Sequence, residues 1–227
     1  VSTVMFSDPD TMDPGRADDD QKNSIILECQ ETLVRLIDGK LTNAGAESYE
    51  TSDDGLVWTF HLRDNKYSDG TPVVAEDYVN SIRRVFDPEV NCHNAGIFYC
   101  IAGGEAFNTG SGAKEDVGAK AIDDKTLEIT LTEPIPYFAQ LLTFANITPV
   151  PESKTEGENN SSYGAIVDDL AQCGPYYISE WTRGSKVVLK KAPTGMLTTS
   201  NWTRSTWFWL RMRTPDSSSS IRDRLIC

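Results

Sequence analysis

The chain has 227 residues, of which 39% are hydrophobic and 24% are charged, as in ordinary soluble globular proteins. Asp and Glu number 34 against 21 Lys and Arg, and the net charge of −13 argues against the basic face of a nucleic-acid-binding protein. No run approaches the roughly 18 apolar residues of a membrane span, and no signal peptide precedes Val1, so we expect a cytosolic chain or one that starts after a removed leader.

The charge changes sign near the end of the chain. Residues 192–227 hold five Arg, no Lys and only two Asp, together with three of the five Trp and the serine run at 217–220. The preceding residues are strongly acidic. Such an abrupt change is typical of a new domain, a fusion scar or an artefact.

The first part of the chain shows strand and helix patterns in alternation. Residues 2–6 predict a short strand, and turn residues follow it. Apolar residues at helical spacing predict an amphipathic helix over 22–37, which Gly39 ends. Strands are predicted at 46–51 and 57–62, joined by an Asp-Asp-Gly turn, and apolar side chains alternate along the second strand.

The rest of the chain repeats this alternation. Acidic residues open a helix over 75–86, and Asp-Pro ends it. Asn and Gly indicate loops and short helices over 89–113. The elements predicted after that are a hairpin at 118–122 and 127–131, a short helix at 137–144, a surface loop at 152–164, and a hairpin at 176–181 and 185–190. Antiparallel hairpins interleaved with helices predict an α+β fold.

Residues with catalytic or metal-binding chemistry are sparse. There is no nucleophile elbow and no phosphate-binding loop, so we expect no enzyme activity and no cofactor. The run Asp18-Asp19-Asp20 lacks the spacing of a calcium loop, and we interpret it as a solvated loop that caps the 22–37 helix. Because His61 and His93 are the only histidines and no Cys-x-x-Cys pair occurs, no metal site is predicted.

The five cysteines leave two interpretations open. They are separate free thiols, or Cys92 and Cys100 form a local bridge in an exported protein.

Residues 46–82 carry a long pattern of strand, Asp-Asp-Gly hairpin, strand ending in Leu-Arg-Asp, Ser-Asp-Gly-Thr-Pro turn, and helix opening with Ala-Glu-Asp. Further matches are Ser7-Asp8-Pro9, Met12-Asp13-Pro14, Glu31-Thr32-Leu33-Val34-Arg35, the segment 118–127, Pro136-Tyr137-Phe138, Pro149-Val150-Pro151, Gly174-Pro175-Tyr176 and Glu180-Trp181. Together they make residues 1–191 closely resemble the family 5 extracellular solute-binding proteins, the oligopeptide- and dipeptide-binding subunits of ABC importers. In one departure, Val74 stands where the family usually has a Thr N-cap, so we expect Thr71 or water to satisfy the free amides.

The resemblance implies the first lobe of a two-lobed periplasmic-binding-protein fold (class II, peptide-binding type), α+β with mixed and antiparallel sheets and helices, the second lobe being absent. Residues 1–29 would start the core of lobe I, and 30–150 would form its subdomain of hairpins and helices. Residues 151–191 would return to that core, and 192–227 would be a tail outside the family pattern.

The family also implies a function. Its members hold an extended peptide between two lobes and deliver it to a permease after hinge closure. We therefore expect a periplasmic or extracellular monomer whose partners are a peptide and ABC permease subunits, with no nucleic acid, and with membrane contact only through a lipid anchor upstream of this chain. The alternatives are a family member that binds nickel, haem or a sugar, and a truncated product without function.

Family position also points to ligand-binding residues. The loop at Arg16, Ala17, Asp18, Asp19 and Asp20 is expected to face the cleft and to offer backbone groups to the ligand. The further candidates are Asn94, Phe98 and Tyr176.

The tail suggests its own explanation. When the codons that encode residues 194–227 are regrouped one nucleotide out of register, they yield segments similar to the family, including a Gly-x-Ile-Asp segment. We therefore hypothesise a one-nucleotide frameshift near Lys191 and expect a poorly ordered tail. A genuinely divergent tail is the alternative.

Overall fold

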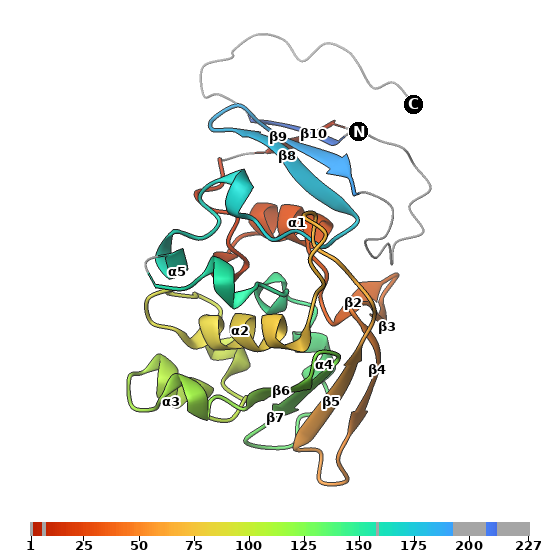
Figure 1. Cartoon of the computed structure of the whole chain (residues 1–227), viewed down its shortest axis with the longest axis vertical. Coiled ribbons are helices and arrows are strands. Elements are labelled where there is room, and N and C mark those ends of the chain that lie inside the picture. Colours follow the sequence, from red (N-terminus) through yellow and green to blue (C-terminus); the bar gives the residue numbers. More distant parts are fainter. Residues whose placement is uncertain (1, 6–7, 158, 193–207, 213–227) are drawn as a thin grey trace.

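The computed structural model describes residues 2–5, 8–157, 159–192 and 208–212. It places one four-stranded sheet at the top of Figure 1 and a second at the bottom, with a long helix, α2 (Ala75–Phe86), between them. A two-stranded hairpin lies at one side. In this described part of the chain, no helix is long and apolar enough to cross a membrane.

The upper sheet joins strands from both ends of the chain. Its order is β1 (Ser2–Met5), β10 (Phe208–Met212), β9 (Lys186–Lys191) and β8 (Tyr176–Thr182). The first two strands are parallel to each other, and the other neighbours are antiparallel. Buried side chains of β8 and β9 pack against α1 (Asp20–Cys29) and form a second, smaller core.

The strand β10 comes from the segment outside the family pattern. Residues 208–212 lie between β1 and β9, and the expectation of a poorly ordered tail stays a prediction. The other residues of 193–227 lie outside the described part of the chain.

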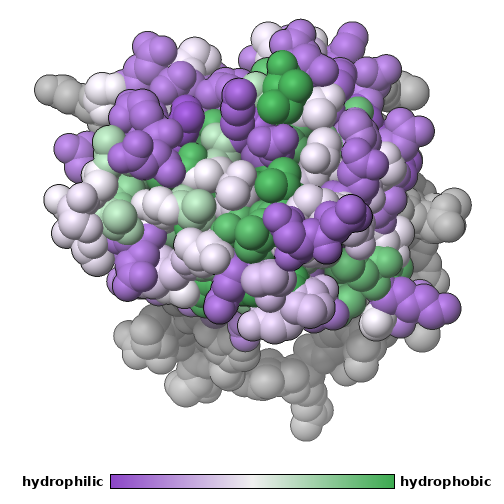
Figure 2. Space-filling view, turned by 90° about the horizontal axis from the view of Figure 1, so that it is seen from below, coloured by the Kyte–Doolittle hydropathy of each residue, from purple (hydrophilic) through white to green (hydrophobic). Residues whose placement is uncertain are grey.

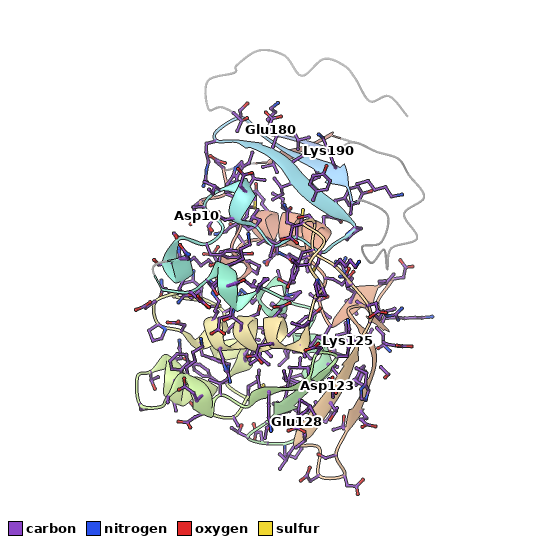
Figure 3. The ribbon with its side chains drawn as sticks, in the orientation of Figure 1. Asp10, Asp123, Lys125, Glu128, Glu180 and Lys190 are labelled. Carbon is purple, nitrogen blue, oxygen red and sulfur yellow. The ribbon has the colours of Figure 1, made fainter. Side chains whose placement is uncertain are left out.

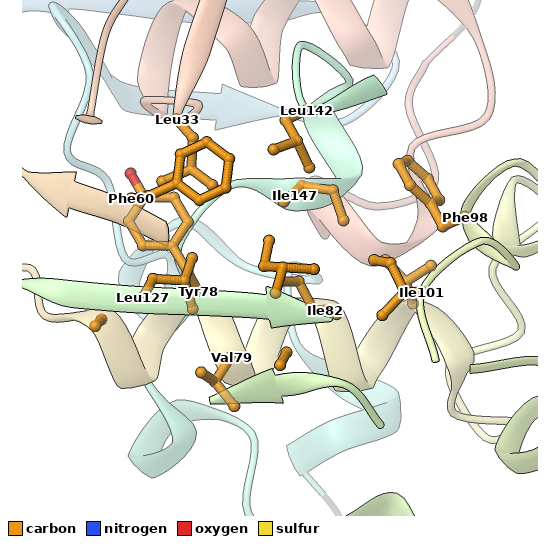
Figure 4. Close-up of a cluster of buried hydrophobic side chains, with 14 of the residues drawn as sticks. Leu33, Phe60, Tyr78, Val79, Ile82, Phe98, Ile101, Leu127, Leu142 and Ile147 are labelled. Carbon is orange, nitrogen blue, oxygen red and sulfur yellow. The ribbon is translucent and has the colours of Figure 1, made fainter. Parts of the chain in front are cut away.

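The lower sheet and α2 enclose the main core. Its strand order is β4 (Ala46–Thr51), β5 (Val57–Leu62), β7 (Thr126–Thr130) and β6 (Ala119–Asp123), all antiparallel. The predicted bounds of β4, β5 and α2 are confirmed, as is the predicted alternation along β5. Figure 4 shows Phe60 and Leu127 of this sheet beside Tyr78 and Ile82 of α2, and all four are almost completely buried.

The N-terminus of α2 is capped by a residue that sequence reasoning did not consider. The Asp77 carboxylate accepts a hydrogen bond of 3.0 Å from the backbone N–H of Val74. The Thr71 hydroxyl donates instead to Asp69 at 2.6 Å. For Thr71 the expectation is therefore corrected: the third helical residue reaches back, as in one half of a capping box, and the Ala75 N–H donates to the Asp124 carbonyl at 2.9 Å.

The predicted helix over 22–37 is wrong beyond Cys29. The chain continues as β2 (Val34–Ile37), which pairs with β3 (Lys40–Asn43). Distant contacts end the helix, because the Cys29 carbonyl accepts the backbone N–H groups of Cys173 and Gly174 at 3.0 and 2.9 Å. Those contacts come from a segment far along the chain, so local spacing could not reveal them.

Short helices fill the connections. The α-helices are α3 (Gly104–Asn108), α4 (Phe138–Leu141) and α5 (Asn159–Ser162). The 3-10 helices are η1 (Pro14–Arg16), η2 (Ala95–Phe98), η3 (Lys114–Asp116), η4 (Ala145–Ile147), η5 (Glu152–Lys154) and η6 (Val167–Asp169). The surface loop expected over 152–164 is therefore partly helical. Its Tyr163 is buried rather than at the surface, and the Tyr163 hydroxyl accepts a hydrogen bond from the Ala171 N–H at 3.1 Å.

The lower end of the molecule is a water-facing surface. Figure 2 views this end directly and shows hydrophilic side chains around smaller groups of apolar ones. Such a mixture is normal for the exposed surface of a folded protein.

Candidate ligand-binding site

The loop expected to face a ligand is held at both ends by aspartate caps. Before it, the Asp13 side chain accepts the N–H of Gly15 at 2.9 Å and begins η1. Near the end of the loop, Asp19 is the N-cap of α1, and its side chain accepts hydrogen bonds from the N–H groups of Gln21 and Lys22 at 2.9 and 2.8 Å. The interpretation of this run as a helix cap is confirmed, and Asp20 is the first residue of that helix.

The Asp18 carboxylate contacts two side chains of its own chain, a lysine and a histidine. It forms an ion pair with Lys22 and lies 2.8 Å from the Nδ1 atom of His93. Lys22 is only 5% exposed. Its ammonium also forms an ion pair with Asp10, which is labelled in Figure 3, at 3.0 Å. The hydrogen bond from Lys22 lowers the pKa of Asp18, so this carboxylate is ionised and engaged near neutral pH.

Two asparagines from distant segments anchor the loop backbone. The Ala17 carbonyl accepts a hydrogen bond from Asn94 at 3.0 Å and from Asn146 at 3.2 Å. The Asn146 amide also donates to the Pro14 carbonyl at 2.8 Å and accepts from Asn94 at 3.1 Å. Because the Ala17 N–H donates to Pro14 at 3.1 Å, both backbone groups of Ala17 are already used.

The next residue, Asp18, has backbone groups without a hydrogen-bond partner among the described residues. Asp18 is exposed, and its backbone N–H and C=O form no hydrogen bond with any residue that the structure describes. An exposed pair of this kind is what the edge of a β-strand offers to an extended peptide. The loop therefore leaves the main-chain groups of Asp18 without a partner in the described part of the chain, while the side chains of Arg16, Asp18 and Asp19 are engaged within the chain.

The structure gathers some of the predicted site residues and separates others. Arg16 to Asp20 and Asn94 lie together, and the Arg16 Nε atom donates to the Val90 carbonyl at 3.1 Å. Phe98 is fully buried in the main core, against the ring of Phe144, with ring centroids 6.0 Å apart. Tyr176 lies elsewhere, on β8 in the smaller core. The role of these residues in binding a ligand stays a prediction.

Sequence reasoning did not find three parts of this arrangement. His93 was noted only as a histidine, while Lys22 and Asn146 were not singled out as site residues. Asn146 comes from η4, more than a hundred residues after the loop that it anchors. Contacts over such a separation leave no signal in the local pattern of a single sequence.

No metal centre is apparent. Among the described residues, no group of His, Cys, Asp and Glu has an arrangement that could hold a metal ion. Cys92 and Cys100 are free thiols in the structure, so the alternative of a local bridge is not realised there. A polar cavity of about 280 Å³ lies between α2 and residues 152–160, and the loop at 16–20 does not line it.

Comparisons with known proteins give the chain its relatives. It is 39% identical to the periplasmic oligopeptide-binding protein OppA of Escherichia coli (strain K12) over 83% of its own length and 35% of that protein. The structure is similar to Listeria monocytogenes OppA bound to peptide, with a TM-score of 0.84 and 30% identity over 94% of this chain and 42% of that one. It is also similar to the substrate-binding domain of an oligopeptide ABC transporter from Bacillus anthracis, with a TM-score of 0.79 and 33% identity over 84% of this chain and 37% of that one.

The chain spans about a third of the length of the curated relatives it matches. This coverage agrees with the expected fold class, which is one lobe of a peptide-binding protein. Residues 40–194 match the sequence pattern of the bacterial extracellular solute-binding proteins, family 5, in its middle region. The resemblance stated from the sequence is thereby confirmed, and the chain belongs to the family 5 bacterial extracellular solute-binding proteins.

Proposed function

We propose that this chain forms one wall of the peptide site in the solute-binding component of an ABC importer. The observation that carries the proposal is its structural similarity, over 94% of its length, to an OppA with a peptide bound. Members of the family are binding proteins rather than enzymes, which agrees with the expectation that this chain has no catalytic activity.

The loop geometry supports recognition through the main chain. The exposed N–H and C=O groups of Asp18 are suited to pairing with the backbone of an extended peptide. Main-chain pairing needs no particular ligand side chain, so it suits a protein that accepts many peptide sequences. Asp18 is therefore the residue that we place in direct contact with the ligand.

The rest of the functional assignment follows from the family. The solute-binding family is extracellular or periplasmic, and we place this protein there. Closure onto a second lobe, delivery to permease subunits, a lipid anchor and a monomeric state belong to the same proposal. The division of the chain at 1–29, 30–150 and 151–191 also stays a prediction.

The proposal is tested by NMR titration of the 227-residue chain with trialanine, following the backbone amide signals. We expect concentration-dependent shifts at Asp18 and at its neighbours in the loop at 16–20. Titrations with nickel, haem and glucose serve as controls for the other ligand classes. Shifts with one of these but not with trialanine, or no shifts with any ligand, would contradict the proposal.

A matched pair of variants tests the main-chain contact itself. Asp18→Pro removes the backbone N–H, whereas Asp18→Ala keeps this donor and removes only the carboxylate. Ala17 has an extended backbone at ψ 103°, which a following proline accepts. We expect Asp18→Ala to bind trialanine and Asp18→Pro to lose binding while keeping the rest of its amide spectrum. Equal binding by both variants would refute the role of the N–H.

A further inference from the structure

We propose that Asn146 is a positioning residue that aims the backbone N–H of Asp18 out of the protein and toward the ligand. The inference rests on the proposed function for its ligand. It concerns a residue for which sequence and family position predicted no role in binding. Asn146 does not touch the ligand itself; it acts through the peptide bond between Ala17 and Asp18.

The argument begins with the planarity of that bond. In a trans peptide unit, the carbonyl of one residue and the N–H of the next point in opposite directions. The Ala17 carbonyl is turned inward, where it accepts hydrogen bonds from Asn94 and Asn146. The N–H of Asp18, at the other side of the same plane, must therefore point outward.

Asn146 is placed to fix this orientation. It is 1% exposed, and its amide joins Pro14, Ala17 and Asn94 within 3.2 Å. Its donors thus bind carbonyls at both ends of the turn from Pro14 to Ala17. Asn94 is half-buried and supplies one further donor, so Asn146 is the more enclosed of the two anchors.

The side chains of the loop do not replace this anchor. Arg16 donates to Val90, and the Asp18 carboxylate is bound by Lys22 and His93. These contacts hold side chains on either side of the peptide unit but do not hold its carbonyl. Without Asn146, the Ala17 carbonyl keeps only the Asn94 donor, and that amide in turn loses the Asn146 oxygen that it also binds, so the 17–18 peptide plane is held less firmly.

The test uses Asn146→Ala with Asn80→Ala as its matched control. Asn80 is 3% exposed, and its amide likewise donates to two acceptors, the Val150 carbonyl and the Thr155 hydroxyl, at 2.9 and 3.0 Å. It anchors α2 to residues 150–155 and does not contact the loop. Both variants remove a buried amide that donates to two oxygen acceptors; Asn146 in addition donates to the Cys92 sulfur at 3.7 Å and accepts from Asn94 at 3.1 Å, so Asn80→Ala matches the loss of the oxygen-bound donor only.

Two measurements are made on each variant. The carbonyl carbon NMR shift of Ala17, recorded without ligand, reports whether its hydrogen bonds persist. Affinity for trialanine is measured by titration. We expect Asn146→Ala to shift the Ala17 signal and to weaken binding by about tenfold or more. Asn80→Ala should leave the signal in place and the affinity within about twofold of wild type.

The outcomes separate this inference from the proposed function. An unchanged Ala17 signal in Asn146→Ala, or an equal loss of affinity in both variants, overturns the positioning role. If wild type does not bind trialanine, the proposed function fails, and the Ala17 signal alone decides whether Asn146 orients the loop. If Asn146→Ala does not fold, Asn94→Ala takes its place, because it removes a single donor from the same carbonyl at a less buried position.

Discussion

Replacing Arg84 by Met is expected to destabilise the protein strongly. The Arg84 guanidinium is bound to both oxygens of the Asp13 carboxylate, at 2.9 and 2.8 Å. Arg84 is 3% exposed and Asp13 is not exposed at all. The guanidinium also donates to the side chain and backbone of Asn160 at 2.9 and 3.0 Å, so one side chain joins three distant segments.

The magnitude follows from the carboxylate that is left behind. Met occupies much of the space of the Arg84 stem, so the main loss is electrostatic rather than a cavity. Breaking a buried ion pair from one side costs about 3–5 kcal/mol, because the remaining charge is desolvated and unpaired. Asp13 keeps its hydrogen bond from Gly15 and a longer ion pair with Arg16, whose Nε atom lies 3.9 Å away, so we expect the loss at the lower end of this range, about 3 kcal/mol. For a chain of this length, the loss corresponds to a melting temperature lower by about 10 °C.

Urea unfolding followed by circular dichroism gives the free energy of unfolding directly. The control is Arg83→Met on the same helix, since Arg83 pairs with Glu76 at 3.4 Å near the surface and should contribute about 1 kcal/mol or less. In Asp13→Asn/Arg84→Met, the buried charge is gone, and we expect part of the stability to return. A loss in Arg84→Met no larger than in Arg83→Met would refute the reasoning.

Three further predictions concern packing, pH and thiol chemistry. In Gly174→Ala, the new Cβ would lie 2.6 Å from backbone atoms of residues 29 and 30, so urea unfolding should show a free energy of unfolding lower by more than about 2 kcal/mol. The control Gly96→Ala has open space around the new Cβ, and its free energy of unfolding should fall by less than about 0.5 kcal/mol. The hydrogen bond from the Lys22 ammonium lowers the pKa of Asp18 below its ordinary 3.8. The stabilisation that this pair gives the folded protein is therefore fully present above pH 3.8, and it is lost as the pH falls through the pKa of Asp18 in the folded state. Lys22→Gln should therefore lower the melting temperature more at about pH 6 than at about pH 3, and an equal effect at both would contradict this. Burial raises the pKa of Cys92 to about 11, so mass spectrometry should show much slower alkylation by iodoacetamide at about pH 8 than for glutathione.

The elements predicted correctly from the sequence are those fixed within one continuous segment. Alternation along β5 and the capped apolar face of α2 are local patterns, and each was found with its observed bounds. The family pattern over residues 46–82 covers the same elements, so residue chemistry and resemblance agree there. The apolar face predicted for the strand at 57–62 is the face that the structure buries, with Trp58, Phe60 and Leu62 at most 7% exposed.

The errors lie where the chain meets a distant part of itself. Residues 25, 29, 33 and 37 have helical spacing, yet the helix ends at Cys29 because the segment at 173–174 takes its carbonyl. Leu33 and Val34 are adjacent in the sequence, yet both side chains are fully buried in the main core. A period measured along the chain cannot distinguish a helix face from such a segment.

For the candidate site, the sequence predicted the loop, its helix cap and backbone groups offered to a ligand, but not the contacts that hold the loop in place. Asp19 caps the helix as expected, whereas the binding of Asp18 to Lys22 and His93 was not foreseen. The backbone N–H and C=O of Asp18, an exposed residue, form no hydrogen bond with any residue that the structure describes. In the proposed function, the charged side chains hold this loop in place, and the peptide unit between Ala17 and Asp18 contacts the ligand. We expect such a site to recognise the extended backbone of a peptide rather than its side chains, and we infer that it depends on Asn146, which lies behind the peptide unit.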